Sequence, residues 1–156
     1  MALKKGDKAP AFKLPDSDKK EVSLDNFKGK NLVILFFPLA FTSVCTTELC
    51  NMRDNIADYA VVNADVVAIS VDSPFTLDKY KKSENLPFRL LSDFNKEASA
   101  AYGSLYENFT LGMKGVSKRS AFVIDKEGTI QYAEVLESAG DLPDFDAVKQ
   151  TLASLN

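Results

Sequence analysis

The chain has 156 residues, a formal net charge of −3 and an isoelectric point near 5.0. Its length and its content of 46% hydrophobic and 26% charged residues fit one soluble globular unit, so we expect a single domain over residues 1–156. The acidic balance argues against nucleic acid as a partner, because proteins that bind nucleic acid usually display a basic face. The longest apolar run, Leu32 to Phe41, is too short to span a membrane.

The N-terminal part of the chain predicts a β-hairpin followed by a buried strand. Turn-forming residues at 16–20 separate the short segments 12–14 and 21–24, which is typical of a hairpin. Residues 32–37 then form an unbroken run of branched and aromatic side chains that ends at Pro38. Such a run indicates a strand that is buried on both faces.

A helix that contains both cysteines is predicted after Pro38. Thr42 and Ser43 are hydroxyl residues that can cap a helix. Apolar residues then recur at helical spacing, at Leu49, Met52, Ile56 and Tyr59. Cys45 is therefore expected in the first turn of a helix that leaves the edge of a buried sheet.

The remaining segments predict an α/β protein. Residues 65–71 form a second apolar run after the helix, which makes a β-α-β unit with parallel strands. Further elements are a helix from Ser73-Pro74 to about Ser83, a strand at 88–92, a short helix at 95–102, an irregular segment at 105–117, strands at 120–125 and 129–136, and a helix after Pro143. We expect a thioredoxin-like fold with a central mixed sheet flanked by helices.

The residue types limit the chemistry of any active site. The chain has no histidine, which excludes Cys-His and Ser-His nucleophilic pairs and zinc sites that use histidine. Two cysteines cannot form a four-cysteine zinc site, and flavin and haem have no support, so we expect no metal and no cofactor. Residues 1–6 show no apolar signal region, and a cytoplasmic location is expected. In that compartment a close cysteine pair indicates redox or catalytic use rather than a permanent disulfide.

Cys45 is the candidate nucleophile. A thiol reacts as its thiolate, and an ordinary cysteine, with a pKa of about 8.5, is mostly protonated at neutral pH. The unsatisfied N–H groups and the positive dipole end of a helix favour the anion in the first turn. Arg119 stands directly before the predicted strand at 120–125, where its side chain could reach the sheet edge that holds Cys45.

Cys50 cannot bond to Cys45 while their helix is intact. At about 1.5 Å rise and roughly 100° rotation per residue, the two Cα atoms are about 8 to 9 Å apart. A disulfide requires less than about 7 Å between Cα atoms. If the two cysteines react together, the first helical turns must unwind, so the oxidised protein should adopt another conformation.

These residues resemble a known family. Pro38, Thr42 and Cys45 fit the pattern P-x-x-x-T-x-x-C, the active-site signature of the peroxiredoxins, and the resemblance extends over nearly the whole chain. The spacing of Cys50 is similar to the bacterioferritin comigratory protein or Q-type group, whereas later segments look more like the alkyl hydroperoxide reductase E group. Supporting segments are residues 6–12, 70–72, 91–93, 102–103, 112–116 and 119–125.

The resemblance implies a thiol-dependent peroxidase. Cys45 looks like the cysteine that attacks a hydroperoxide and becomes a sulfenic acid. Thr42 resembles the residue that binds the peroxide, and Pro38 the residue that shields the thiolate. Arg119 resembles the arginine that stabilises the thiolate, and Glu48 a residue that orients this arginine.

The resemblance also implies partners, but several alternatives stay open. Cys50 is expected to resolve the sulfenic acid as a Cys45–Cys50 disulfide, which thioredoxin or a similar dithiol protein would reduce. Alternatively Cys50 only packs, and an external thiol resolves Cys45. The chain could instead be a peroxide sensor or redox relay, or a thioredoxin-like binding module with inert cysteines. Monomer and homodimer are both compatible with the sequence.

Overall fold

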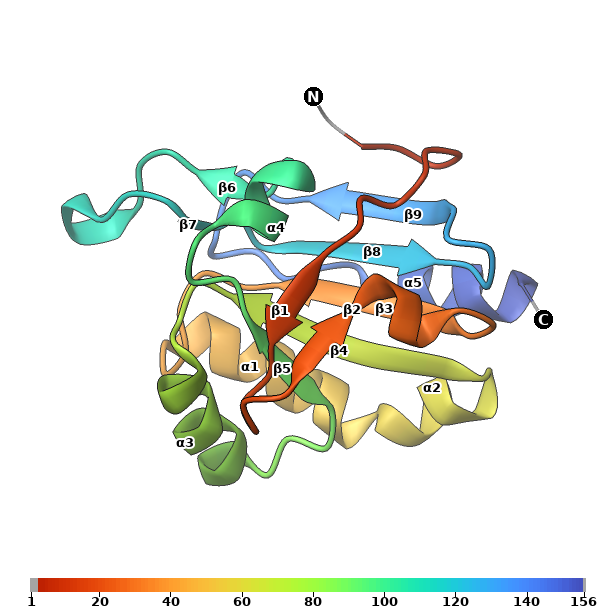
Figure 1. Ribbon diagram of the computed structural model, residues 1–156, viewed down its shortest axis with the longest axis horizontal. Coiled ribbons are helices and arrows are strands. Elements are labelled where there is room, and N and C mark those ends of the chain that lie inside the picture. Colours follow the sequence, from red (N-terminus) through yellow and green to blue (C-terminus); the bar gives the residue numbers. More distant parts are fainter. Residues whose placement is uncertain (1–2, 156) are drawn as a thin grey trace.

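A five-stranded mixed sheet forms the centre of the structure, a computed structural model that describes residues 3–155 (Figure 1). Residues 1, 2 and 156 of the expected 1–156 domain lie outside the described residues. The strands lie side by side in the order β5-β4-β3-β8-β9. Their bounds are Asn31–Phe36 for β3, Ala64–Ser70 for β4, Arg89–Ser92 for β5, Ser120–Ile124 for β8 and Ile130–Val135 for β9.

Strand β3 is the central strand, and all six of its residues are buried. It pairs in parallel with β4, which pairs in parallel with β5. On its other side β3 pairs antiparallel with β8, and β8 pairs antiparallel with β9. The predicted buried strand, the parallel second strand and the mixed sheet are confirmed.

Two layers cover the faces of the sheet, because successive side chains of a strand point to opposite sides. Val33 and Leu35 pack in one core cluster with apolar side chains of four helices, whereas Ile34 and Phe36 pack in the other. In Figure 1 these helices lie behind the strands or below the lower edge of the sheet, and the N-terminal hairpin lies in front of it. The helices are α1 (Ser43–Asp54), α2 (Ile56–Val61), α3 (Pro74–Glu84) and α5 (Phe145–Ser154).

The predicted N-terminal hairpin is confirmed. Strand β1 (Lys13–Pro15) pairs antiparallel with β2 (Glu21–Ser23), and a single 3₁₀ turn, η1 (Leu24–Phe27), follows. Leu14 and Val22 face each other across the hairpin and are buried against the sheet. The hairpin thereby covers the face of β3 that carries Ile34 and Phe36.

The helix predicted to extend as far as Tyr59 is two helices, so its predicted continuity was wrong. Asn55 lies between α1 and α2 with φ −113° and ψ 13°. Its side-chain Nδ2 donates a 2.8 Å hydrogen bond to the carbonyl of Asn51. Asparagine side chains compete in this way for backbone groups and interrupt helices. Tyr59 is nevertheless buried in the same core cluster as Leu49.

The segment expected to be irregular contains a small ladder that the sequence did not predict. Strand β6 (Leu105–Tyr106) pairs antiparallel with β7 (Val116–Ser117), and the 3₁₀ turn η2 (Thr110–Gly112) lies between them. Two-residue strands are too short to show an alternating pattern. The short helix α4 (Glu97–Ala101) precedes this ladder, as predicted. Within residues 3–155, we find no helix of the length and apolarity needed to cross a membrane.

Candidate active site

The sheet topology brings Cys45 and Arg119 to the same edge. Strand β3 ends at Phe36, which lies opposite Ser120, the first residue of the antiparallel strand β8. Pro38 is buried two residues after the end of β3, and α1 begins five residues later at Ser43. The residue before β8 therefore meets the first turn of α1 across this edge.

The loop between β3 and α1 is fixed by contacts with its surroundings. Phe41 has a left-handed backbone with φ +67°, and its ring lies 4.8 Å from the ring of Tyr80. Thr42 occupies the N-cap position, but its hydroxyl donates a 2.8 Å hydrogen bond to the carbonyl of Leu39 rather than capping the helix. The expected side-chain cap is therefore wrong. Thr42 is exposed, and its hydroxyl keeps acceptor lone pairs available three residues before Cys45.

Arg119 directly contacts the Cys45 sulfur. Both side chains are buried, Cys45 with 1% and Arg119 with 2% of its surface exposed. Arg119 Nη2 donates a 3.3 Å hydrogen bond to Cys45 Sγ. Its other groups are also engaged, because Nη1 donates to Glu48 Oε1 at 2.8 Å and Nε to the carbonyl of Ala139 at 2.9 Å. A guanidinium fixed on three sides can direct its charge at the sulfur.

Glu48 is fully buried beside Arg119, and opposing influences set its charge. Burial raises the pKa of Glu48 to about 7, although the charge and the hydrogen bond of Arg119 act to lower it. Among residues 3–155, its Oε2 has no hydrogen-bond partner. Burial also acts to lower the pKa of Arg119, but Glu48 and the Cys45 sulfur outweigh it, so Arg119 stays charged. The structure therefore brings Glu48, Arg119 and Cys45 together.

Cys50 lies on another face of α1. Its Sγ donates a 3.5 Å hydrogen bond to Glu84 Oε2 of α3, whereas Cys45 contacts Arg119. Both cysteines are free thiols in the structure, as the spacing on an intact helix requires. Sequence reasoning missed Glu84, because no local pattern indicates which residue of another helix will contact Cys50.

The comparisons with known proteins agree with this geometry. The AhpC/TSA family model matches residues 5–133. The chain belongs to the AhpC/TSA family of peroxiredoxins. Peroxiredoxin Bcp of Escherichia coli is 37% identical over 132 residues, which cover 83% of this chain and 84% of that protein. The crystal structure of peroxidoxin BcpB from Mycobacterium tuberculosis superposes with a TM-score of 0.87 at 29% identity and covers 99% of both chains.

A bovine relative bears a more specific name. The mitochondrial thioredoxin-dependent peroxide reductase of Bos taurus is 40% identical over 154 residues, which cover 92% of this chain and 56% of that protein. Together these matches establish a thiol-dependent peroxidase with the thioredoxin fold of the peroxiredoxins. The Bcp relatives agree with the predicted likeness to the bacterioferritin comigratory protein group.

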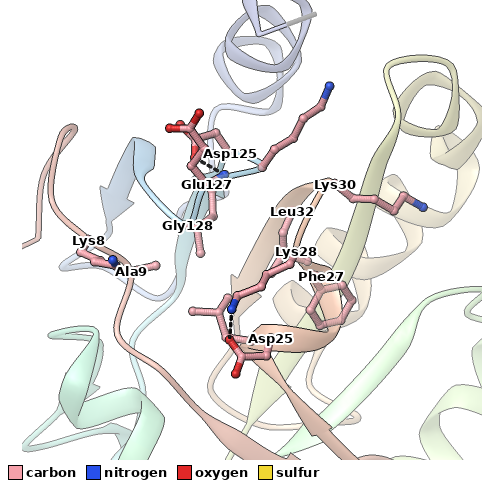
Figure 2. Close-up of a pocket in the computed structure, with 13 residues that line it drawn as sticks. Lys8, Ala9, Asp25, Phe27, Lys28, Lys30, Leu32, Asp125, Glu127 and Gly128 are labelled. Carbon is pink, nitrogen blue, oxygen red and sulfur yellow. Dashed lines mark hydrogen bonds and ion pairs between the residues drawn. The ribbon is translucent and has the colours of Figure 1, made fainter.

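A separate pocket of about 300 Å³ lies far from Cys45. It is formed where β3 begins and β8 ends, so roughly the length of a six-residue strand, about 20 Å, separates it from the peroxiredoxin site. Figure 2 shows Asp25 and Lys28 approaching each other at its rim, 3.6 Å apart. Its four lysines are accompanied by three carboxylates, which favours no single class of charged ligand. These residues are Lys8, Lys28, Lys30, Lys126, Asp25, Asp125 and Glu127.

Glu48→Gln should make the stability of the peroxiredoxin less dependent on pH. Because the folded-state pKa of Glu48 is raised, its stabilising contribution is complete below about pH 4.5 and is lost as the pH rises through about 7. Glutamine stays neutral and still accepts from Arg119. The free energy of unfolding of the wild type relative to the variant should therefore fall by up to about 3 kcal/mol between pH 5 and 8. Urea unfolding at each pH measures it, and parallel curves would contradict the shift.

Proposed function

We propose that Cys45 is the residue of this peroxidase that attacks the hydroperoxide. The Cys45 thiolate attacks one peroxide oxygen, an S–O bond forms as the O–O bond breaks, and Cys45 becomes a sulfenic acid. The second oxygen leaves as hydroxide or alkoxide and takes a proton from water, which yields water or an alcohol. The observation that carries the proposal is the 3.3 Å contact from Arg119 Nη2 to Cys45 Sγ.

We assign roles to the residues around Cys45 from their positions. The Arg119 guanidinium stabilises the thiolate and the negative charge that develops on the leaving oxygen. The Thr42 hydroxyl, which donates to Leu39, accepts a hydrogen bond from the hydroperoxide O–H. Pro38 is buried at the end of β3, and its ring limits the access of water to the sulfur. Glu48 holds Arg119 through its 2.8 Å contact.

Cys50 completes the proposed cycle as the resolving cysteine. Its sulfur attacks the Cys45 sulfenic acid, an S–S bond forms, and the S–O bond breaks to release water. The first turns of α1 unwind in this step, because the intact helix holds the two sulfurs on different faces. A dithiol protein such as thioredoxin then reduces the disulfide and is itself oxidised, in keeping with the name of the bovine relative.

Partner proteins are proposed to dock at the edge that holds Cys45. Phe41, Phe75 and Phe94 follow the ends of β3, β4 and β5, and all three are exposed. Exposed apolar side chains gathered at one edge favour protein contacts. We include a second copy of the chain, as a homodimer, and a dithiol reductant among these partners, and we place the protein in the cytoplasm.

Intact mass after one equivalent of hydrogen peroxide tests the cycle. The wild type should lose about two mass units as the disulfide forms, and Cys50→Ser should gain about sixteen as the sulfenic acid persists. With thioredoxin and its reductase, the wild type should consume many equivalents of peroxide, whereas Cys50→Ser should stop near one. Unimpaired cycling of Cys50→Ser would show that another thiol resolves Cys45. Wild-type consumption that stops near one equivalent would indicate a sensor.

A further inference from the structure

One face of α1 is joined to α3 by three polar contacts that peroxide binding does not use. Thr46, Cys50 and Arg53 follow one another at helical spacing on this face. Thr46 Oγ1 lies 3.0 Å from the Tyr80 hydroxyl, and Cys50 Sγ donates to Glu84 Oε2 at 3.5 Å. Arg53 Nη1 donates a hydrogen bond to the Glu84 carbonyl at 2.6 Å. Cys50 therefore occupies the middle of an interhelical contact.

The surroundings of Cys50 favour its neutral form. Burial raises the pKa of the thiol, and the hydrogen bond to Glu84 raises it further. On its own helix, Asp54 acts in the same direction and Arg53 opposes it. Two residues of α3 lie close enough to interact with the Cys50 sulfur, namely Glu84 and Tyr80. A carboxylate that accepts a hydrogen bond from the thiol would repel the thiolate.

We propose that Glu84 is a positioning residue for disulfide formation, which holds Cys50 as a neutral thiol against α3 until α1 unwinds. The inference rests on the proposed role of Cys50 as the resolving cysteine. Attack on the Cys45 sulfenic acid requires the Cys50 thiolate, because the thiol is a poor nucleophile. Unwinding of α1 moves Cys50 from the carboxylate into water, where it ionises more readily. The proton leaves with the sulfenic hydroxyl as water, so the step is balanced.

This arrangement links reactivity to conformation. While α1 is folded, Cys45 is held beside Arg119 to meet peroxide, and Cys50 is held away from it by Glu84. Release of the Glu84 contact both frees Cys50 to move and increases its thiolate fraction. Loss of the Glu84 carboxylate should therefore speed resolution without changing the residues that contact peroxide.

Alkylation of Cys50 by iodoacetamide between pH 6 and 10, in a Cys45→Ser background, tests the contact without peroxide chemistry. Glu84→Gln should increase the alkylation rate at pH 7.5 by roughly three- to tenfold and move the pH profile to lower values. The Arg53 contact should persist, since it uses the Glu84 carbonyl. Asp54→Asn removes the same charge nearby without a bond to Cys50, and its change should be less than about twofold. An unchanged profile for Glu84→Gln would overturn the proposal.

Stopped-flow and quenched mass measurements of the sulfenic acid then test the step itself. In the protein that retains Cys45, Glu84→Gln should convert the sulfenic acid to the disulfide at least about three times faster than the wild type does. Tyr80→Phe removes the hydroxyl that Thr46 contacts but keeps the Glu84 carboxylate, so it should change the rate of conversion by less than Glu84→Gln does. If the wild type forms a disulfide but Glu84→Gln changes neither the alkylation rate of Cys50 nor the rate of disulfide formation, only the Glu84 proposal fails. If the wild type forms no disulfide, the resolving role of Cys50 fails, and the Glu84 proposal with it.

Discussion

Replacing Cys45 with serine is expected to lower the rate of peroxide reduction by at least about 10³-fold. A serine hydroxyl is far less acidic than a thiol, so Arg119 at 3.3 Å cannot generate a comparable nucleophile from it. The measurement is hydrogen peroxide consumption with thioredoxin and its reductase present in excess. Residual activity in the variant should be indistinguishable from the buffer and reductant background.

The Cys45→Ser result needs evidence that the fold is intact. Cys45 is buried, but serine is similar in size and its hydroxyl can accept the hydrogen bond from Arg119 Nη2. We therefore expect a melting temperature within a few degrees of the wild type. Cys50→Ser is the matched control, because it removes the other thiol and should keep the first turnover. Unchanged peroxide consumption in Cys45→Ser would favour the binding module with inert cysteines.

The sequence predicted the elements that depend on local patterns. The apolar run before Pro38 became β3, with every residue buried, and Ser73-Pro74 began α3 with Ser73 as its cap, as predicted. Two features were missed for physical reasons. At the break, the side chain and the backbone N–H of Asn55 share the Asn51 carbonyl, and such a local side-chain contact gives no periodic signal. The ladder between β6 and β7 has strands of two residues, too short to produce a periodic signal.

The candidate site was predictable where topology alone decides proximity. Arg119 stands directly before the predicted strand at 120–125, where it could reach the edge that holds Cys45, and the observed pairing of β8 with β3 brings it there. Contacts between helices were not predictable, because they depend on how α1 and α3 rotate against each other. The resolving role of Cys50 came from the family resemblance and stays a prediction, whereas its neighbour Glu84 emerged from the packing.

Arg119→Met should lower the second-order rate constant for peroxide by about 10² to 10³-fold and also destabilise the fold. The kinetic loss follows because the variant removes the charged donor to the sulfur and to the leaving oxygen. The stability loss follows because Glu48 is left buried without its partner, at a cost of about 3–5 kcal/mol while it is charged. Since Arg119 lowers the pKa of Glu48, its removal raises that pKa further, and the cost should be larger at pH 8 than at pH 5.

The double variant Arg119→Met/Glu48→Gln separates these two effects. Glutamine cannot hold a charge, so the double variant should recover part of the unfolding free energy and lose the extra destabilisation at pH 8. Its rate constant with peroxide should stay low, because it lacks the Arg119 guanidinium that contacts Cys45. Stopped-flow kinetics and urea unfolding, both at pH 8, measure the two quantities. If activity returned together with stability, Arg119 would serve the fold through Glu48 rather than the chemistry at Cys45.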